Sequence, residues 1–299
     1  MKIDKQNGNV AFAEDEHVYW DVTDSSKKYI SVTTLIHNYT KPFNKEFWSA
    51  YKALEKLIPK ESWAIEKKSL LATKRFNKEI LNIYDISEND FNKAQQDILD
   101  KWQKENMEAC ERGTKIHAQM ENSMYSDNVS LKKFGIGGKF IGKKNYCTLD
   151  LENAVYPEYL IYRVSDDGIL RIAGQIDLLI KQSNEITLVD FKTNKKIDLK
   201  GGFDTKTKKT DKMLYPLNRL DDCNFNHYTL QLSTYAWMLQ KLNPDFIIKD
   251  LILYHFDHEG NETLYHCDYL KRDVENMLYH HKKKVIREEQ KNKIKPIEY

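Results

Sequence analysis

The chain has 299 residues, of which 40% are hydrophobic, enough to bury a large core in one domain with insertions or in two joined lobes. Its formal net charge of only +2 excludes the strongly basic class of nucleic-acid coat proteins, so any contact with a nucleic acid has to come from local patches. No secretory signal, transit peptide or membrane span is visible, and we expect a cytoplasmic protein without a membrane partner, in the host cytoplasm if the chain is viral.

We expect residues 1–100 to form an N-terminal β-hairpin and a helical lobe. Residues 10–32 have strand character and predict a hairpin that turns at residues 24–26. Residues 43–121 have helical spacing and are rich in Ala, Leu, Lys and Glu, with a break near residues 85–90. We expect this helical block to form a lobe that shapes a substrate channel.

Polar residues gather at the end of the helical block, where His117 and Glu121 lie one turn apart. Gly113 inside this helix costs about 1 kcal/mol relative to Ala, which indicates close approach of another backbone or of a ligand. A lone histidine on a helix is more often a satisfied core residue, so this segment by itself does not define a site.

Residues 156–164, 169–180 and 185–191 are apolar and β-branched and predict three strands, the last two joined in an antiparallel hairpin. Asp177 and Asp190 then lie near each other across the hairpin. Two carboxylates in apolar surroundings carry a desolvation cost unless a positive charge lies between them, and a hard cation with oxygen ligands fits that need.

Lys192 points to the same face of its strand as Asp190, because side chains alternate along a strand. An ammonium there can orient a nucleophilic water or stabilise charge that develops on a phosphoryl group. The alternative is a structural Asp–Lys ion pair at a sheet edge.

Lysines crowd the loop at residues 195–228, between the hairpin and the next helix. Its lysines are Lys195, Lys196, Lys200, Lys206, Lys208, Lys209 and Lys212. We expect a loop that guides a nucleic-acid strand.

A second basic patch is formed by Lys132, Lys133, Lys139, Lys143 and Lys144. For a third, at residues 280–295, a solvated surface is the favoured interpretation, because Glu288 and Glu289 interrupt it. The candidates for stacking on unpaired bases are Trp48, Trp63, Tyr215 and Tyr228, although for most of them a place in the core is the favoured interpretation.

Residues 228–242 have the apolar spacing of a core-seeking helix, on which Gln231 and Tyr235 form a polar stripe four residues apart. A further strand is predicted at residues 246–256, a short edge strand at 264–267 and a closing helix at 270–289.

Taken in order, four of these motifs resemble the RecB-like branch of the PD-(D/E)XK nuclease superfamily. They are G-T-x-x-H at Gly113 to His117, G-x-[IV]-D at Gly174 to Asp177, D-F-K-T at Asp190 to Thr193 and Q-x-x-x-Y at Gln231 to Tyr235. The resemblance covers residues 102–256, and the segment Ser31 to Thr34 is similar to the entry of phage and mitochondrial genome-maintenance exonucleases of this branch. The second acidic position is Asp190 rather than Glu, and the Pro of the family name is absent before Asp177.

The resemblance implies an α/β fold in which residues 101–299 form a restriction-endonuclease-like core, a central mixed sheet flanked by helices. It implies that Asp177, Asp190 and Lys192 are catalytic, with Lys192 positioning the attacking water. The implied ligands of Mg²⁺ or Mn²⁺ are His117, Asp177, Asp190 and the backbone carbonyl of Phe191, with Glu158 or Glu121 as candidates for a further carboxylate. The implied substrate-binding residues are Gln231, Tyr235, Arg112, Thr114, Thr193, Lys195 and Lys196.

The expected function is that of a Mg²⁺-dependent exodeoxyribonuclease that hydrolyses phosphodiester bonds from DNA ends, on single strands or overhangs, in viral or cellular recombination, replication or repair. DNA is the expected partner, and replication or recombination proteins are further candidates. A flap-type endonuclease has the same active site, and a non-catalytic nucleic-acid-binding subunit is an alternative of another class. The presence of the whole set His117, Asp177, Asp190 and Lys192 argues against that last alternative.

Two cofactors are not expected. A G-x-x-x-x-G-K-[ST] phosphate loop is missing, so we expect no ATP site. The four cysteines, Cys110, Cys147, Cys223 and Cys267, are far apart, so we expect free thiols and no iron–sulfur cluster.

Overall fold

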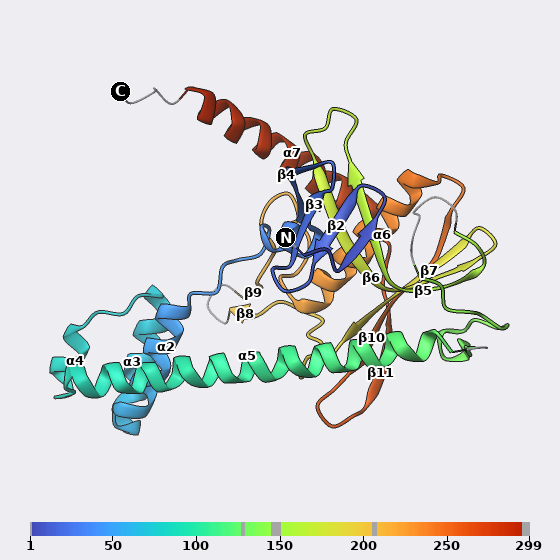
Figure 1. Ribbon diagram of the computed structural model, residues 1–299. Helices are drawn as coiled ribbons and strands as arrows, with labels where there is room; N and C mark the ends of the chain where they lie inside the picture. The colour runs from blue at the N-terminus through green and yellow to red at the C-terminus, as the bar shows by residue number, and fades with distance from the viewer. Residues whose placement is uncertain (1, 127–128, 145–150, 205–207, 295–299) are drawn as a thin grey trace. The chain divides into compact units, whose positions relative to one another are not determined.

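The computed structural model describes residues 2–126, 129–144, 151–204 and 208–294. By residue contacts the chain divides into two compact units, Met1–Lys41 with Lys115–Tyr299 (unit 1) and Pro42–Thr114 (unit 2). The division falls inside helix α5 (Glu88–Met124), so it differs from the expected boundary at residue 100 and groups the N-terminal strands with the large sheet (Figure 1).

Unit 1 contains a nine-stranded mixed sheet with the order β1-β2-β3-β4-β6-β7-β10-β11, in which β5 also pairs with β6. Its strands are β1 (Lys5–Asn7), β2 (Val10–Ala13), β3 (Val18–Asp21), β4 (Asp24–Ser31), β5 (Ala154–Val164), β6 (Arg171–Gln182), β7 (Glu185–Lys192), β10 (Ile247–Phe256) and β11 (Glu262–His266). The pairs β4–β6 and β7–β10 are parallel, and the other pairs are antiparallel.

Strand β6 organises this sheet. Along one edge it pairs with β5 over nearly its whole length. On the other edge β4 pairs only with Ile172 and Ala173, and β7 pairs only from Leu178 onward. Residues 174–177, the Gly-Gln-Ile-Asp motif, therefore have a strand partner on one side only, and a gap opens between β4 and β7.

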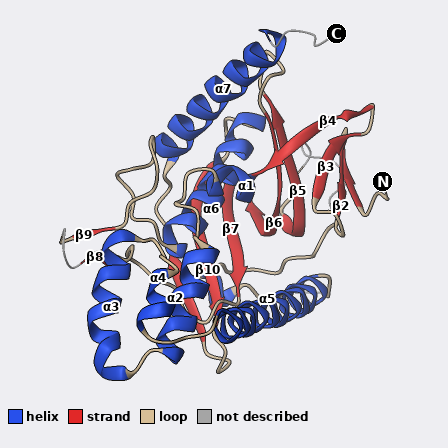
Figure 2. Ribbon diagram, turned by 90° about the vertical axis from the view of Figure 1, so that its left-hand side faces the viewer, coloured by secondary structure: helices blue, strands red, loops and turns tan. Residues whose placement is uncertain are grey.

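Helices cover both faces of the sheet. On one face the core includes α1 (Val32–His37), α6 (Asn224–Leu242) and α7 (Lys271–Ile294), and Figure 2 shows α6 and α7 on the same side of the strands. The other face is covered by the C-terminal end of α5 and residues 129–140, which include the short helix η1 (Lys132–Phe134). The expectation of a mixed α/β fold with a central sheet flanked by helices is confirmed.

The side chains of β7 alternate between these two layers. Ile186 and Leu188 belong to the core on the α6 side, whereas Val189 and Phe191 belong to the core beneath the end of α5. Asp190 and Lys192 thus face α6, because alternate side chains of a strand share a face.

Unit 2 is helical, as the spacing predicts. It consists of α2 (Lys45–Leu57), α3 (Lys60–Thr73), α4 (Glu79–Ile83) and the first part of α5. Its own buried core includes Phe47, Leu54, Leu70 and Phe91. The helical pattern breaks at residues 84–87, close to the predicted break.

Two local features differ from the prediction or add to it. The N-terminal hairpin turns at Val22 and Thr23 rather than at residues 24–26, because the Asp21 side chain accepts hydrogen bonds from the backbone N–H of Thr23 (2.9 Å) and from its hydroxyl (2.6 Å). The Lys-rich loop contains a small hairpin of β8 (Phe203–Asp204) and β9 (Lys209–Thr210); Lys206 lies outside the described residues. Among the described helices, none combines the length and the apolar character needed to cross a bilayer.

Candidate metal centre

The two aspartates of the hairpin meet where β6 and β7 separate. Leu178 and Val189 are the last paired residues of the two strands, and Asp190 continues along β10 opposite Leu253. The Asp177 carboxylate accepts a hydrogen bond of 2.6 Å from the backbone N–H of Phe191. Both aspartates are buried, with exposed fractions of 9% for Asp177 and 1% for Asp190. This is the proximity that the hairpin pattern predicts.

Glu158 lies directly opposite Asp177 on the other edge of β6. Pro157 pairs with Leu178 and Tyr159 with Ile176, which leaves Glu158 facing Asp177. Its φ is +49°, a left-handed conformation that costs a residue with a side chain about 1–2 kcal/mol. Strain of this kind persists only where the surroundings impose it, and it concentrates at functional sites.

His117 of α5 completes a group of three potential ligands. Its Nδ1 lies 3.5 Å from Oε1 of Glu158 and 3.7 Å from Oδ1 of Asp177. One ligand atom from each of the three residues lies within 4.8 Å of the others, close enough to surround one cation. The other ring nitrogen of His117, Nε2, lies 3.1 Å from the backbone carbonyl of Phe191, so a further oxygen lies beside the same histidine.

The electrostatics of this group favour an added positive charge. Burial raises the pKa of Asp177, and the neighbouring charge of Asp190 raises it further, to about 7. Burial lowers the pKa of His117, but Asp177 and the hydrogen bond with Glu158 outweigh that effect and raise it to about 9. Burial raises the pKa of Glu158, yet His117 and Lys5 hold it below its usual value. Without a metal, protons and basic side chains balance the carboxylates.

Asp190 is held by different partners. Its Oδ2 lies 2.5 Å from the Nζ of Lys192, and its Oδ1 accepts a hydrogen bond of 3.0 Å from Nε2 of Gln231 on α6. The Lys192 ammonium also lies 4.8 Å from the centre of the Tyr228 ring. Burial lowers the pKa of Lys192, but the two aspartates outweigh burial and raise it, so this amine stays charged.

The glycine of the Gly-Gln-Ile-Asp motif has a packing role. A Cβ on Gly174 would lie 2.6 Å from Cε1 of Tyr235 and 2.8 Å from its hydroxyl oxygen. The buried Tyr235 ring therefore packs directly on the backbone of β6, which ties α6 to the strand of Asp177. The Gln-x-x-x-Tyr helix and the Gly-x-Ile-Asp strand thus form one packing unit.

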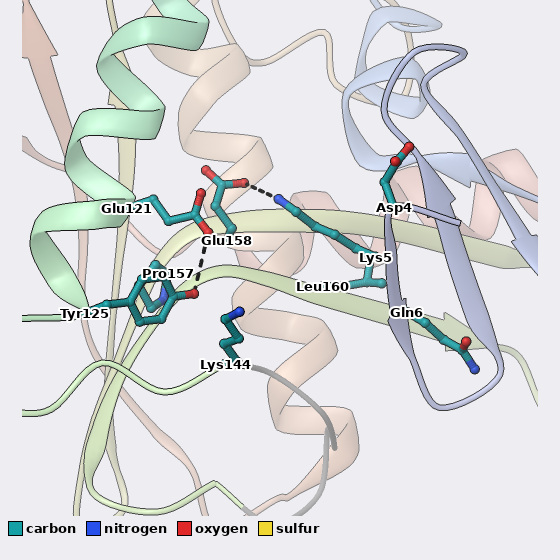
Figure 3. A pocket seen from close by; sticks show the side chains of 9 residues that line it. All are labelled: Asp4, Lys5, Gln6, Glu121, Tyr125, Lys144, Pro157, Glu158 and Leu160. Carbon is teal, nitrogen blue, oxygen red and sulfur yellow. Dashed lines mark hydrogen bonds and ion pairs between the residues drawn. The ribbon is translucent and has the colours of Figure 1, made fainter. Parts of the chain in front are cut away.

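A cavity of about 310 Å³ opens beside Glu158. Figure 3 shows Lys5, from β1, and Glu158 pointing toward one another across it, and their side chains lie 3.5 Å apart. Glu121 of α5 lines the same cavity, with its Oε1 3.5 Å from the Tyr125 hydroxyl, but it lies outside the group of three ligands. Of the two candidate glutamates, Glu158 joins His117 and Asp177.

The remaining expected substrate residues lie elsewhere on these elements. Arg112 and Thr114 are in the part of α5 that belongs to unit 2, where the Thr114 hydroxyl donates to the Cys110 carbonyl at 3.1 Å. Thr193, Lys195 and Lys196 follow the end of β7, and Lys196 forms an ion pair of 2.6 Å with Asp198.

Three side chains of the site were not singled out for it from the sequence. Gln175 donates to Glu158, and it is visible as the residue two before Asp177 on one strand face. Tyr228 was considered only as a stacking residue, although its position three before Gln231 on one helix places it next to Lys192. Lys5 has no local signal, because 153 residues separate it from Glu158.

The donor set fits a hard divalent cation. Two carboxylates, an imidazole and a backbone carbonyl suit Mg²⁺ or Mn²⁺, and the group contains no thiolate. The described cysteines, Cys110, Cys223 and Cys267, are free thiols; Cys147 lies outside the described residues.

Comparison with known proteins leaves the family open. No protein-family model matches the chain, and no curated protein matches it. Among solved structures, the crystal structure of SSO0001 matches 44% of this chain and 50% of its own, with 16% identity and a TM-score of 0.26. The chain thus spans half the length of that protein.

Proposed function

We propose that the protein is a metal-dependent DNA exonuclease whose core is of the restriction-endonuclease type and belongs to the RecB-like branch of the PD-(D/E)XK superfamily. One observation carries the proposal: His117, Glu158 and Asp177 converge within 4.8 Å beside the Asp190–Lys192 ion pair. The motifs that carry the resemblance come from four separate segments, and three of them supply a side chain to this one place.

The residues that would hold Mg²⁺ or Mn²⁺ are His117, Glu158, Asp177 and the carbonyl of Phe191. When bound, the ion would polarise the scissile phosphate and lower the pKa of a water that attacks it. Asp190 remains a candidate ligand, because it lies near enough to Asp177 for its charge to raise the pKa of that carboxyl group.

The chain itself supplies a fixed cation next to this place. Gln231 holds one oxygen of Asp190, and the other oxygen holds the Lys192 ammonium above the Tyr228 ring. An ammonium fixed in this way can orient the attacking water or stabilise the negative charge that develops on the phosphate, and it needs no reorganisation during the reaction. We assign Lys192 the catalytic role, and Gln231 and Tyr228 the role of positioning it.

The expected substrate is DNA with a single-stranded end, in recombination, replication or repair. The test is cleavage of end-labelled linear single-stranded, linear duplex and closed circular DNA with Mg²⁺, Mn²⁺ or EDTA. Lys192→Ala is compared with Lys181→Ala, which removes a lysine from the adjacent strand β6. We expect metal-dependent loss of linear substrates only, abolished in Lys192→Ala and retained in Lys181→Ala. Cutting of circles would identify an endonuclease, and no cutting with any metal would leave a binding subunit.

A further inference from the structure

We propose that a groove between the loop at Tyr215 and helix α7 binds single-stranded nucleic acid through its phosphates and bases, at a site separate from the metal centre. This rests on the proposed function in so far as it adds a strand-binding surface to the same enzyme. The groove has a volume of about 520 Å³, and none of its lining residues belongs to the group around His117.

The lining is basic. It includes Lys283, Lys284 and Arg287 of α7, and no carboxylate lines it. Within the described part of the chain these three side chains form no ion pair, whereas the adjacent Lys282 is paired with Asp167. Unpaired cations on one surface attract a phosphate backbone and release its counterions, which is the main source of affinity for nucleic acids.

The lining is also aromatic. The Tyr215 side chain is 71% exposed and Tyr279 is 62% exposed, which is unusual for large rings. Lys283 lies 4.3 Å from the centre of the Tyr279 ring. The Tyr215 ring packs edge-on at 5.5 Å against His280, and Nδ1 of His280 lies 3.1 Å from the buried Tyr39 hydroxyl. The Tyr215 ring is thus exposed, but it packs on a histidine that is itself hydrogen-bonded to a buried hydroxyl.

The arrangement on α7 is ordered along the helix. Tyr279, Lys283 and Arg287 are spaced four residues apart, so they form one stripe about 12 Å long at 1.5 Å per residue. Glu288 and Glu289, whose presence favoured a solvated surface in the sequence, do not line the groove. The last residue of the basic run, Lys295, lies outside the described residues.

The combination of unpaired cations and exposed rings favours a single-stranded nucleic acid over other polyanions. Cations that follow a backbone, together with exposed rings on which bases stack, are the pattern of single-strand binding surfaces. A duplex hides the faces of its bases and would use the lysines alone. An acidic protein segment would likewise need the cations and not the rings.

The experiment measures binding of the full-length protein to a fluorescein-labelled oligothymidine by fluorescence anisotropy, in EDTA so that no cleavage occurs. The charge variant is Lys283→Ala/Lys284→Ala. Its matched control is Lys271→Ala/Arg272→Ala, which removes two exposed positive charges from the first turn of the same helix. The ring variants are Tyr279→Ala and Tyr279→Phe, and circular dichroism melting checks that each variant folds.

We expect the charge variant to raise Kd for the single strand about tenfold. The slope of log Kd against log salt concentration should fall by about 0.7 for each lost phosphate contact. The control should change Kd less than about twofold. Tyr279→Ala should raise Kd about tenfold, as loss of about 1.4 kcal/mol of stacking does, whereas Tyr279→Phe should bind like the parent protein. Binding of duplex DNA should respond to the lysines and not to Tyr279.

Equal weakening by the charge variant and its control would overturn the proposal, because overall charge would then explain binding. Unchanged binding of the single strand by Tyr279→Ala would also overturn it, because the ring would then contribute nothing. Cleavage that needs Lys192 but not the groove would leave the nuclease proposal intact and reject this one. Groove-dependent binding without cleavage in any metal would do the reverse.

Discussion

Glu158 and Asp177 face each other across β5 and β6, and Glu158 holds a φ of +49° to do so. A strained backbone, a hydrogen bond from Gln175 and an ion pair with Lys5 together aim this carboxylate at His117.

Glu158→Gln should separate the two roles of this residue. The amide keeps the shape but loses the charge, so we expect Mn²⁺ affinity to fall at least about tenfold in isothermal titration calorimetry. In EDTA the melting temperature should fall, because His117 and Lys5 lower the pKa of Glu158, so its charge stabilises the folded protein. Excess Mn²⁺ should then stabilise the variant less than the parent protein. Glu185→Gln, on an exposed ion pair of β7, is the control, and equal affinity of the two variants would remove Glu158 from the site.

Metal binding should release protons. His117, with a pKa of about 9, and Asp177, with a pKa of about 7, must both lose their protons before they bind a cation. Affinity should therefore rise with pH, by about two decades per pH unit below pH 7 and by about one between pH 7 and 9. Calorimetry in buffers of different ionisation enthalpy counts the released protons directly, and His117→Gln should release one fewer. An affinity that does not change with pH would contradict the assigned ligands.

The Asp190–Lys192 pair should behave as a buried ion pair in stability measurements. Lys192→Met leaves Asp190, 1% exposed, with Gln231 as its hydrogen-bond partner, so we expect a loss of about 3 kcal/mol of unfolding free energy. The double variant Asp190→Asn/Lys192→Met should recover most of that loss, because no uncompensated charge remains. Urea denaturation in EDTA measures both values, and a double variant less stable than Lys192→Met would contradict the prediction.

The ring beneath Lys192 should influence turnover. Tyr228→Leu removes the ring that lies 4.8 Å from the ammonium, and we expect kcat to fall about tenfold, as loss of about 1.4 kcal/mol does. Tyr228→Phe keeps the ring and loses only the hydrogen bond to Asn194, so its kcat should be close to that of the parent. The measurement is single-turnover cleavage of saturating DNA. If both variants lose activity equally, the hydroxyl rather than the ring is required.

Gly174→Ala should test the contact between α6 and β6. The added methyl group would lie 2.6 Å from Cε1 of Tyr235, so strand or ring has to move, at a cost of about 1–3 kcal/mol. Tyr235→Leu alone should also destabilise the protein. The loss of unfolding free energy in the double variant should be smaller than the sum of the two single losses, by about 1 kcal/mol or more. Gly137→Ala, where the added methyl group meets nothing within 4 Å, is the control for a change of glycine. Strict additivity in thermal unfolding would show that the two residues do not compete for space.

The sequence predicts the elements of this site better than its geometry. Runs of apolar and β-branched residues define β6 and β7, and a two-residue period places Asp190 and Lys192 on one face, as the structure has them. The partners of those residues depend on how strands far apart in the chain are ordered. The gap between β4 and β7 along β6 follows from the β4–β6 pairing of Ile30 with Ile172, which no local pattern contains. The left-handed backbone of Glu158 is equally hidden, because a glutamate in an apolar strand has no sign of strain in its sequence.

The long separations in the chain set an order for folding during synthesis. Lys5 meets Glu158, and Asn7 donates a hydrogen bond to the Leu160 carbonyl, each across 153 residues. A ribosome needs on the order of ten seconds to add that length of chain, whereas local helices form in microseconds. The contacts of α2, α3 and α4 are available early, and β1 has to wait for β5 to emerge. The N-terminal segment, made first, is thus among the last to find its place beside the carboxylates.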